Sequence, residues 1–255
     1  MEAGEVVTAG DATGPRPSRL DDYPALMSSA RSPMLRLLRA LSAVPIGLVA
    51  TVVAIAFFKW LGAGESTARA AAVVVGGGVI ALVACVVLGK GPAHLRRVAS
   101  DRRPPLRAII VGVGAGVLGL IIAGLILLVG RAVDPSAKRA LDRLGDQDIG
   151  IQVWWQAVLI GVAVVVIAPF GEEILFRGVI LRSLTARFTW WPATIVSALV
   201  FAGSHLDAYL AWPRALALVA LGILLAVVYR RQGLIGSMTM HATVNTAALI
   251  ALLLR

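Results

Sequence analysis

The stretch VWWQAVLIGVAVVVIAPFGEEILFRG, residues 153–178, indicates what kind of fold this chain adopts. Its apolar part is close to the roughly 20 residues that a helix needs to cross the hydrocarbon of a membrane. Two adjacent carboxylates and an arginine follow, and such groups are costly inside a bilayer unless they face other helices or a wet cavity. The stretch therefore predicts a membrane-spanning helix that carries a functional site.

The composition agrees with a membrane protein built from several such helices. Of the 255 residues, 58% are hydrophobic and 15% are charged, whereas a soluble domain carries about 25% charged residues. The mean hydropathy is +0.86. We expect an all-α fold, namely a polytopic transmembrane helical bundle of about seven spans. The predicted spans are about 41–61, 70–89, 108–129, a segment from Val153 into residues 170–178, 190–206, 213–229 and 234–254.

The chain divides into three predicted regions. Residues 1–32 are rich in Gly, Ala, Pro, Ser, Asp and Arg without apolar periodicity, a composition typical of a disordered tail. Residues 33–150 are expected to form N-terminal transmembrane helices without a catalytic motif, in which the Gly112–Gly116 spacing favours close helix packing. Residues 151–255 hold the polar motifs described below. The chain has one cysteine, which excludes an intramolecular disulfide and a Cys-based metal site.

The basic residues predict how the spans are oriented. The net charge is +10, and most of the excess falls in short segments between apolar runs, where it sets topology and meets anionic headgroups. If seven spans alternate, the basic-rich segments all fall on one side of the membrane. We therefore expect a multi-pass protein of the plasma membrane with a cytoplasmic N-terminus and a C-terminus outside. The lipid bilayer is then its surrounding partner, and we expect no nucleic-acid partner.

Three short polar sets interrupt the apolar helices of the last hundred residues. Residues four apart share a helix face, so each set presents its side chains together. Each set alone also fits a structural role, such as a buried ion pair or a hydrogen bond between helices. Together they could surround one polar intramembrane cavity in the inner half of the membrane. The sets are Glu172, Glu173 and Arg177; Phe201 and His205; and His241 and Asn245.

In this order, EExxxR, FxxxH and HxxxN resemble the motifs of the CPBP family of intramembrane proteases, relatives of the CAAX prenyl endopeptidases that are also called the Abi family. The resemblance covers about residues 153–254. It implies that region 151–255 is a transmembrane catalytic region that hydrolyses a peptide bond of a membrane protein or peptide substrate. It also implies that Arg177 holds Glu173, which in turn orients its neighbours.

The resemblance further implies a division of roles in hydrolysis. Glu172 with His205 would polarise a water molecule, with Glu172 acting as general base. His241 and Asn245, one helical turn apart, would donate hydrogen bonds to the oxyanion. A metal-assisted version is equally open, because Glu172, His205 and His241 could bind Zn²⁺ and leave one position for water. The most informative zinc-protease signature, HExxH, is absent, and the sequence leaves both versions open.

Other interpretations of the same residues also stay open. A transporter or proton pathway could use the buried Glu, His and Arg groups, and a non-catalytic membrane scaffold could use them to hold helices together. A rhomboid-like serine protease fits less well, because neither Ser204 nor Ser237 lies in a GxSx nucleophile motif. Whether the substrate is prenylated is open. Of the 24 basic residues only Lys59, Lys90 and Lys138 are lysines, a composition that hints at a high-GC bacterium.

Overall fold

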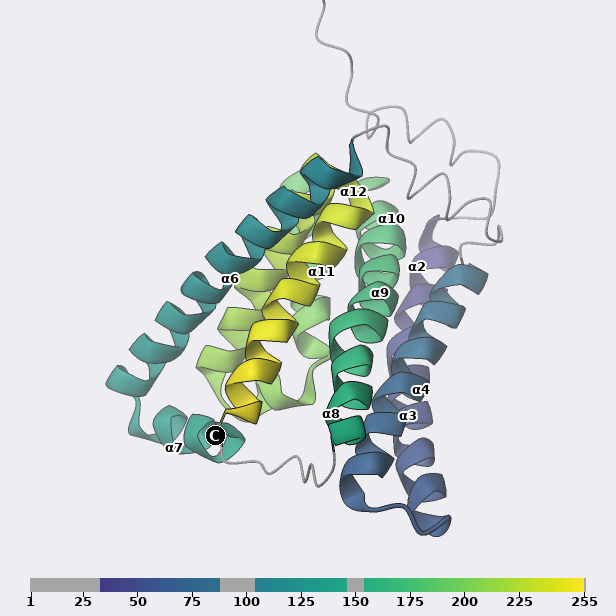
Figure 1. Ribbon diagram of the computed structural model, residues 1–255. Helices are drawn as coiled ribbons and strands as arrows, with labels where there is room; N and C mark the ends of the chain where they lie inside the picture. The colour runs from purple at the N-terminus through teal and green to yellow at the C-terminus, as the bar shows by residue number, and fades with distance from the viewer. Residues whose placement is uncertain (1–32, 88–103, 146–153, 255) are drawn as a thin grey trace, which may run out of the picture. The chain divides into compact units, whose positions relative to one another are not determined.

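The computed structural model describes residues 33–87, 104–145 and 154–254 (Figure 1). Within these ranges every regular element is a helix, which confirms the predicted all-α class. The predicted disordered tail, residues 1–32, lies outside the described residues. The boundaries of the other two predicted regions stay predictions.

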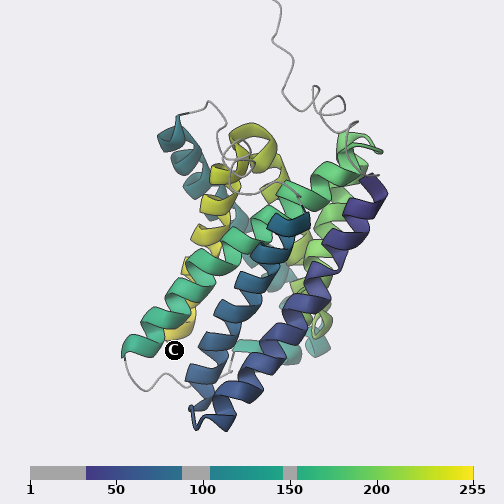
Figure 2. The same cartoon turned by 90° about the vertical axis from the view of Figure 1, so that its right-hand side faces the viewer.

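The N-terminal half consists of long helices that run side by side with the central part of the bundle. Helix α3 packs on α4, and α4 in turn packs on the segment that carries the two adjacent glutamates (Figure 2). The backbone N–H of Ser42 donates to Leu38 O at 3.2 Å, so α2 and α3 follow each other almost without interruption. The helices are α2 (Pro33–Leu41), α3 (Ala43–Trp60), α4 (Glu65–Val87), α6 (Pro105–Val133) and α7 (Pro135–Gly145).

A single helical rod of 32 residues, Trp154–Thr185, forms the centre of the bundle. The sequence prediction ended the fourth span within residues 170–178, but the helix continues to Thr185. It can do so because its polar middle is covered by neighbouring helices, and every residue from Glu173 to Leu181 is buried. The rod consists of α8 (Trp154–Gly161), the π-helix η1 (Val162–Ile167), α9 (Ala168–Glu173), the π-helix η2 (Ile174–Leu181) and α10 (Arg182–Thr185).

The C-terminal part contains α11 (Trp190–Gly203), the short 3₁₀ helix η3 (Leu206–Tyr209) and α12 (Trp212–Leu253). Helix α12 is interrupted at Gly233, whose φ of 72° and ψ of −166° are not helical. Gly130 of α6 lies against Pro213, whereas Gly112 lies against Gly236. The first half of α12 therefore runs antiparallel to α6 and the second half parallel to it, so the chain reverses direction at Gly233. A positive φ of this kind favours glycine, which has no Cβ.

The small residues of α6 form its contact with α12, as the GxxxG spacing predicted. Gly112, Gly116 and Gly119 are buried, and a Cβ on Gly112 would lie 2.6 Å from Gly236 O. Gly114, on the opposite face, has no neighbouring atom within 4 Å of such a Cβ. Close packing of backbones through small residues is the usual way in which membrane helices associate.

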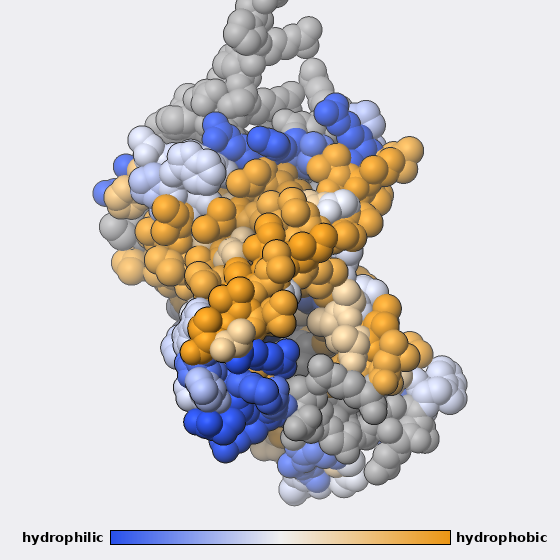
Figure 3. All heavy atoms as spheres, turned by 90° about the vertical axis from the view of Figure 1, so that its left-hand side faces the viewer, coloured by the Kyte–Doolittle hydropathy of each residue, from blue (hydrophilic) through white to orange (hydrophobic). Residues whose placement is uncertain are grey.

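Long apolar helices make this a multi-pass membrane protein. Four described helices are long and apolar enough to cross a bilayer, and two shorter apolar helices accompany them. Figure 3 shows a hydrophobic belt with hydrophilic residues at both ends on one face of the molecule. The predicted count of about seven spans stays a prediction. The four long helices are Leu37–Trp60, Pro105–Val133, Trp154–Thr185 and Trp212–Leu253, and the shorter ones are Val74–Ala84 and Trp190–Gly203.

Asp134 joins three helices at one end of the bundle. Its Oδ1 accepts hydrogen bonds from Ser136 N at 2.8 Å and Ser136 Oγ at 2.6 Å, which caps α7. Its Oδ2 accepts a hydrogen bond from Trp212 Nε1 at 2.9 Å, which attaches the start of α12. The hydrogen bonds from the Ser136 and Trp212 side chains lower the pKa of Asp134 to about 2.

Candidate active site

The two adjacent glutamates lie in a short α-helical segment, α9, between two wider π-helical segments. The backbone N–H of Ala168 donates to Ala163 O, five residues back, which is the π register. Pro169 follows at once, and a proline ring inside an α-helix would clash with the carbonyl four residues before it. Gly171 then lets α9 approach α4 closely, since a Cβ there would lie 2.7 Å from Gly77 O. The backbone that carries Glu172 and Glu173 is therefore held from both sides.

Glu173 and Arg177 form a buried ion pair, with exposed fractions of 0% and 1%. Arg177 Nη1 donates to Glu173 Oε1 at 3.0 Å, and Arg177 Nη2 donates to Gly222 O of α12 at 3.1 Å. The guanidinium carbon lies 4.9 Å from the centre of the Phe201 ring. These contacts join the rod, α11 and α12. A buried pair with this many partners is sensitive to loss of either charge, because the remaining ion would be buried alone.

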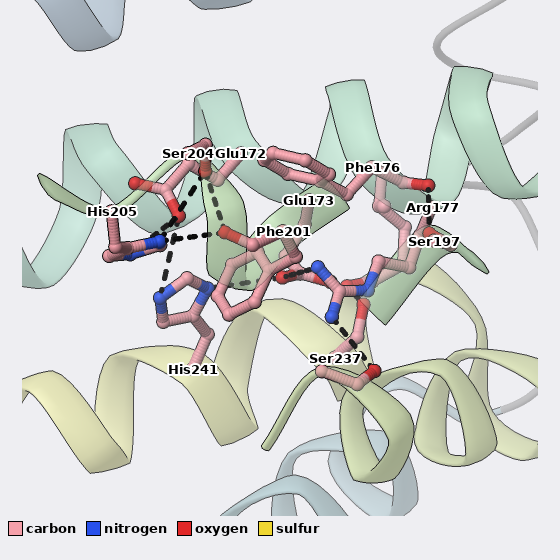
Figure 4. A network of polar contacts seen from close by, with 12 residues as sticks. Glu172, Glu173, Phe176, Arg177, Ser197, Phe201, Ser204, His205, Ser237 and His241 are labelled. Carbon is pink, nitrogen blue, oxygen red and sulfur yellow. Dashed lines mark hydrogen bonds and ion pairs between the residues drawn. The ribbon is translucent and has the colours of Figure 1, made fainter. Parts of the chain in front are cut away.

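His241 approaches the same carboxylate from the second half of α12. Its Nδ1 lies 3.0 Å from Glu173 Oε1 (Figure 4). The carboxylate of Glu173, paired with Arg177, accepts hydrogen bonds, so we assign the proton to Nδ1 of His241. The other ring nitrogen, Nε2, points toward Glu172, with Glu172 Oε2 at 3.9 Å.

His205 approaches Glu172 from the end of α11. Its Nδ1 lies 2.9 Å from the carbonyl oxygen of Phe201, which can only accept, so we assign the proton to Nδ1. Its Nε2 lies 4.0 Å from Glu172 Oε2. The hydroxyl of Ser204 donates to the same Phe201 carbonyl at 2.7 Å and supports this turn. The ring of Phe201 packs against both imidazoles, with 4.8 Å between the ring centres for His205 and 5.8 Å for His241.

The tips of Glu172, His205 and His241 therefore meet at one place, as expected from the sequence. Glu172 Oε2 is buried and has no hydrogen-bond partner in the described part of the chain. A single water molecule can bridge polar atoms at these separations. When each imidazole is neutral and carries its proton on Nδ1, the three atoms that face one another are all acceptors, namely Glu172 Oε2 and the two Nε2 atoms. One water has two hydrogens and can donate to only two of them. One more proton at this place, or a cation, would satisfy the third acceptor.

Asn245 does not join this group. Its Nδ2 donates to the backbone carbonyl of Val164 in η1, at 2.9 Å. The expected hydrogen bond from Asn245 to an oxyanion thus stays a prediction. Ser204 and Gly222 help to position the site, and sequence reasoning assigned them no such part. The carbonyl of Gly222 is a backbone group without a sequence signal.

The residues fit a bound Zn²⁺ only in part. The donor types are suitable, since two imidazole nitrogens and one carboxylate oxygen face one another. Their separations of 3.9 and 4.0 Å exceed the roughly 3.3 Å between ligand atoms of a tetrahedral zinc site. Among the described residues, no group of three or more His, Cys, Asp or Glu side chains has a spacing that could hold a metal ion. Zn²⁺ therefore stays a prediction.

Residues 154–247 match the family model described as type II CAAX prenyl endopeptidase Rce1-like. This segment is thus similar to Rce1-like domains. It begins with the first residue of α8 and contains all six predicted site residues, so the resemblance read from the motifs is confirmed. The Rce1-like family implies a CAAX-type protease that works within the membrane, and it does not favour a transporter.

One curated relative is similar to part of the chain. An "Uncharacterized 24.3 kDa protein" from Escherichia coli is 28% identical over 93 residues, which cover 35% of this chain and 40% of that protein. The chain thus spans about two fifths of the length of this relative. No solved structure matches.

Proposed function

We propose that this protein is an intramembrane endopeptidase that hydrolyses a peptide bond of a membrane-associated protein or peptide with a water activated by Glu172 and His205. One observation carries the proposal most directly. Glu172 Oε2 is buried without a hydrogen-bond partner in the described residues, and Nε2 of both histidines faces it at 3.9 and 4.0 Å. A carboxylate between two imidazoles is suited to take a proton from a water and pass it on.

In this proposal the water lies between Glu172 and His205. Glu172 accepts one proton of the water, and the remaining hydroxide forms a bond to the carbonyl carbon of the peptide. The C–N bond breaks when the nitrogen of the leaving amine receives a proton, which Glu172 or His205 returns. No proton is gained or lost over the cycle apart from those of the water that is consumed.

His241 is suited to stabilise the oxyanion when it is protonated on both ring nitrogens. Its Nδ1–H lies 3.0 Å from Glu173, and this contact holds the ring with Nε2 facing Glu172. The additional proton on Nε2 removes the excess of acceptors around Glu172 and provides a donor for the developing negative charge. Arg177 pairs with the carboxylate of Glu173 and holds it in place for this contact with His241.

The proposal also includes the membrane, the number of spans and the side on which each terminus lies. We place the protein in the plasma membrane with seven spans, a cytoplasmic N-terminus and a C-terminus outside. The direction of the chain supports this, because α2 begins at one end of the bundle and α12 ends at the other (Figure 1). Arg230, which stacks on Trp190 with 4.7 Å to the ring centre, lies just before the reversal at Gly233 and marks a basic, aromatic end of the bundle.

Comparative proteomics of membrane fractions tests the function. Cells that contain the wild-type protein should accumulate cleaved fragments that are absent from cells with Glu172→Gln. Glutamine keeps the shape of glutamate but cannot act as a base, so the loss would be chemical. Glu65→Gln, a change of another glutamate at the start of α4 that pairs with Lys59, is the matched control and should cleave normally. Full cleavage by Glu172→Gln would refute the proposal, and proton or ion flux lost in that variant would indicate a transporter.

A further inference from the structure

Pro169 removes a hydrogen-bond donor from the rod just before the two glutamates. In η1 the N–H of Ala168 donates five residues back, to Ala163 O. In the same register Val164 O would accept from residue 169, but proline has no N–H. Inside a membrane a backbone carbonyl without a donor is costly, since no bulk water replaces the lost bond. Val164 O therefore needs a partner from another part of the chain.

That partner is the side chain of Asn245. Its Nδ2 donates to Val164 O at 2.9 Å, across the contact between α12 and the rod. We propose that Asn245 is a positioning residue: its amide replaces the N–H that Pro169 lacks, keeps η1 in the π register, and so directs Glu172 toward His205 and His241. The effect on the reaction rests on the proposed function, whereas the effect on the helix does not.

The register of η1 determines the direction of Glu172. Without Asn245, Val164 O could recover a donor only from the N–H of Ala168, and this α register would press the Pro169 ring against Val165 O and kink the rod. A π turn holds one residue more than an α turn, and each residue of an α-helix turns the chain by about 100°. Loss of the π register would therefore rotate the following segment by roughly that angle. Glu172 and Glu173 follow directly in α9. Both carboxylates would then leave the positions in which they meet the two histidines and Arg177.

This role differs from a direct contact with the oxyanion, and a second substitution separates the two. Replacing Pro169 by alanine supplies a backbone N–H at the position where Val164 O lacks one. The new N–H can do the work of Asn245 on the helix, but it cannot reach a reacting carbonyl from within the rod. A double-mutant cycle therefore tests whether both groups serve the same carbonyl. Its variants are Asn245→Ala, Pro169→Ala and the two substitutions together.

The cycle is measured on the purified full-length protein, by thermal unfolding and by cleavage of a substrate identified in the proteomic experiment. We expect Asn245→Ala to lower Tm by a few degrees and kcat by at least about 100-fold, because a displacement of only about 1 Å already costs a catalytic group that much. Pro169→Ala alone should stay near wild type. The double variant should recover the Tm and come within about threefold of the kcat of Pro169→Ala.

Two controls exclude general effects of the substitutions. Pro192→Ala replaces a proline in the first turn of α11, where the missing N–H leaves no carbonyl of the helix without a donor. This substitution should therefore not rescue Asn245→Ala. Pro169 is fully buried, so Pro169→Val repeats the test with a side chain of similar volume if the alanine variant does not accumulate. Thr246→Val on the neighbouring position removes a hydroxyl that bonds only within its own helix, to Ala242 O, and should leave kcat unchanged.

Each outcome decides the proposal. Recovery of both Tm and kcat in the double variant supports it. Recovery of Tm without kcat would overturn it and place Asn245 on the reacting atoms, and recovery of neither would overturn it altogether. If the wild-type protein cleaves nothing, the proposed function fails, while the Tm values of the cycle still decide whether Asn245 replaces the Pro169 N–H.

Discussion

At the scale of single residues, the buried charges decide what the site can do. Glu173 and Arg177 are almost fully buried, and His241 shares the carboxylate of Glu173 with the guanidinium. This arrangement leaves Glu172 as the carboxylate that has no hydrogen-bond partner on Oε2 in the described chain. The two adjacent glutamates thus have different surroundings. Glu173 is held by Arg177 and His241, whereas Glu172 can still accept a hydrogen bond from a water. Such a difference between neighbouring carboxylates is typical of acid–base sites.

Removal of the Arg177 charge should destabilise the protein and lower its activity. Arg177→Ala leaves Glu173 buried without its ion partner, which typically costs about 3–5 kcal/mol. Thermal unfolding in detergent and the amount of protein in membranes measure this loss. The control is Arg214→Ala, which breaks a partly exposed pair with Asp207 and should cost about 0–1 kcal/mol. Equal stability of the two variants would contradict the structural role given to the buried pair.

At the scale of elements, the site depends on departures from regular helices. The π-helices η1 and η2 flank the α9 turn that carries the glutamates, and the reversal at Gly233 brings His241 back toward the rod. Helix α6 stabilises this hairpin, because its small residues allow both halves of α12 to approach it. The positions of Glu172 and His241 relative to each other thus depend on helix contacts that lie outside the site.

A methyl group on the contact face of α6 should disturb this packing. In Gly112→Ala the new Cβ would lie 2.6 Å from Gly236 O, a backbone atom that cannot move alone. We expect a loss of about 1–3 kcal/mol in unfolding free energy, as for overpacked cores. Gly114→Ala is the matched control, with open space around its Cβ, and should be neutral or slightly stabilising. Equal effects of the two variants on Tm would show that α6 does not pack on α12 through this face.

The cap on α7 should depend on pH at low values. Asp134 has a pKa lowered to about 2 by hydrogen bonds from Ser136 and Trp212, against an ordinary value of 3.8. Its stabilising contribution is therefore fully present above about pH 4 and disappears as the pH falls through about 2. Asp134→Asn should lower the Tm at pH 5, and the difference from wild type should shrink as the pH approaches 2. A difference that stays constant over this range would contradict the role of the carboxylate.

At the scale of the whole molecule, the helices alternate in direction between two ends of one bundle. The rod ends at Thr185, α11 starts nearby, and Arg182 of the rod bonds to Tyr229 shortly before the reversal at Gly233. The opposite end holds the Asp134 cap with Trp212. Basic residues at the first end agree with a cytoplasmic location for it under the positive-inside rule.

Reporter fusions test this orientation. A reporter attached after Arg255 should be found outside the cytoplasm, and one attached before Met1 should be found in the cytoplasm. A fusion within the loop Ala186–Thr189, between the rod and α11, should also report a cytoplasmic position and serves as an internal check. If the two termini lie on the same side, the number of spans is even and the count of seven is wrong.

The helical class of the fold and most residues of the candidate site could be predicted from local patterns in the sequence. Long apolar runs must become membrane helices, because backbone groups in hydrocarbon need internal hydrogen bonds. The spacing of four places Glu173 with Arg177, since a helix has 3.6 residues per turn. The same spacing predicted one helix face for Phe201 and His205, but α11 ends at Gly203 and His205 is held through the Phe201 carbonyl instead. The three motifs, in their order, indicated the CPBP family, with which the Rce1-like match agrees.

The length of the rod and the contacts of its polar groups depend on packing between helices that are distant in the sequence. The rod continues past Glu172 to Thr185 because α4, α11 and α12 bury its polar middle, and no local pattern encodes that cover. Which nitrogen of His241 faces Glu173, and that Asn245 reaches Val164, depend on the reversal at Gly233 and on the register of η1. Contacts between helices distant in the sequence form only when the chain packs, so local periodicity predicts the faces of helices but not their partners.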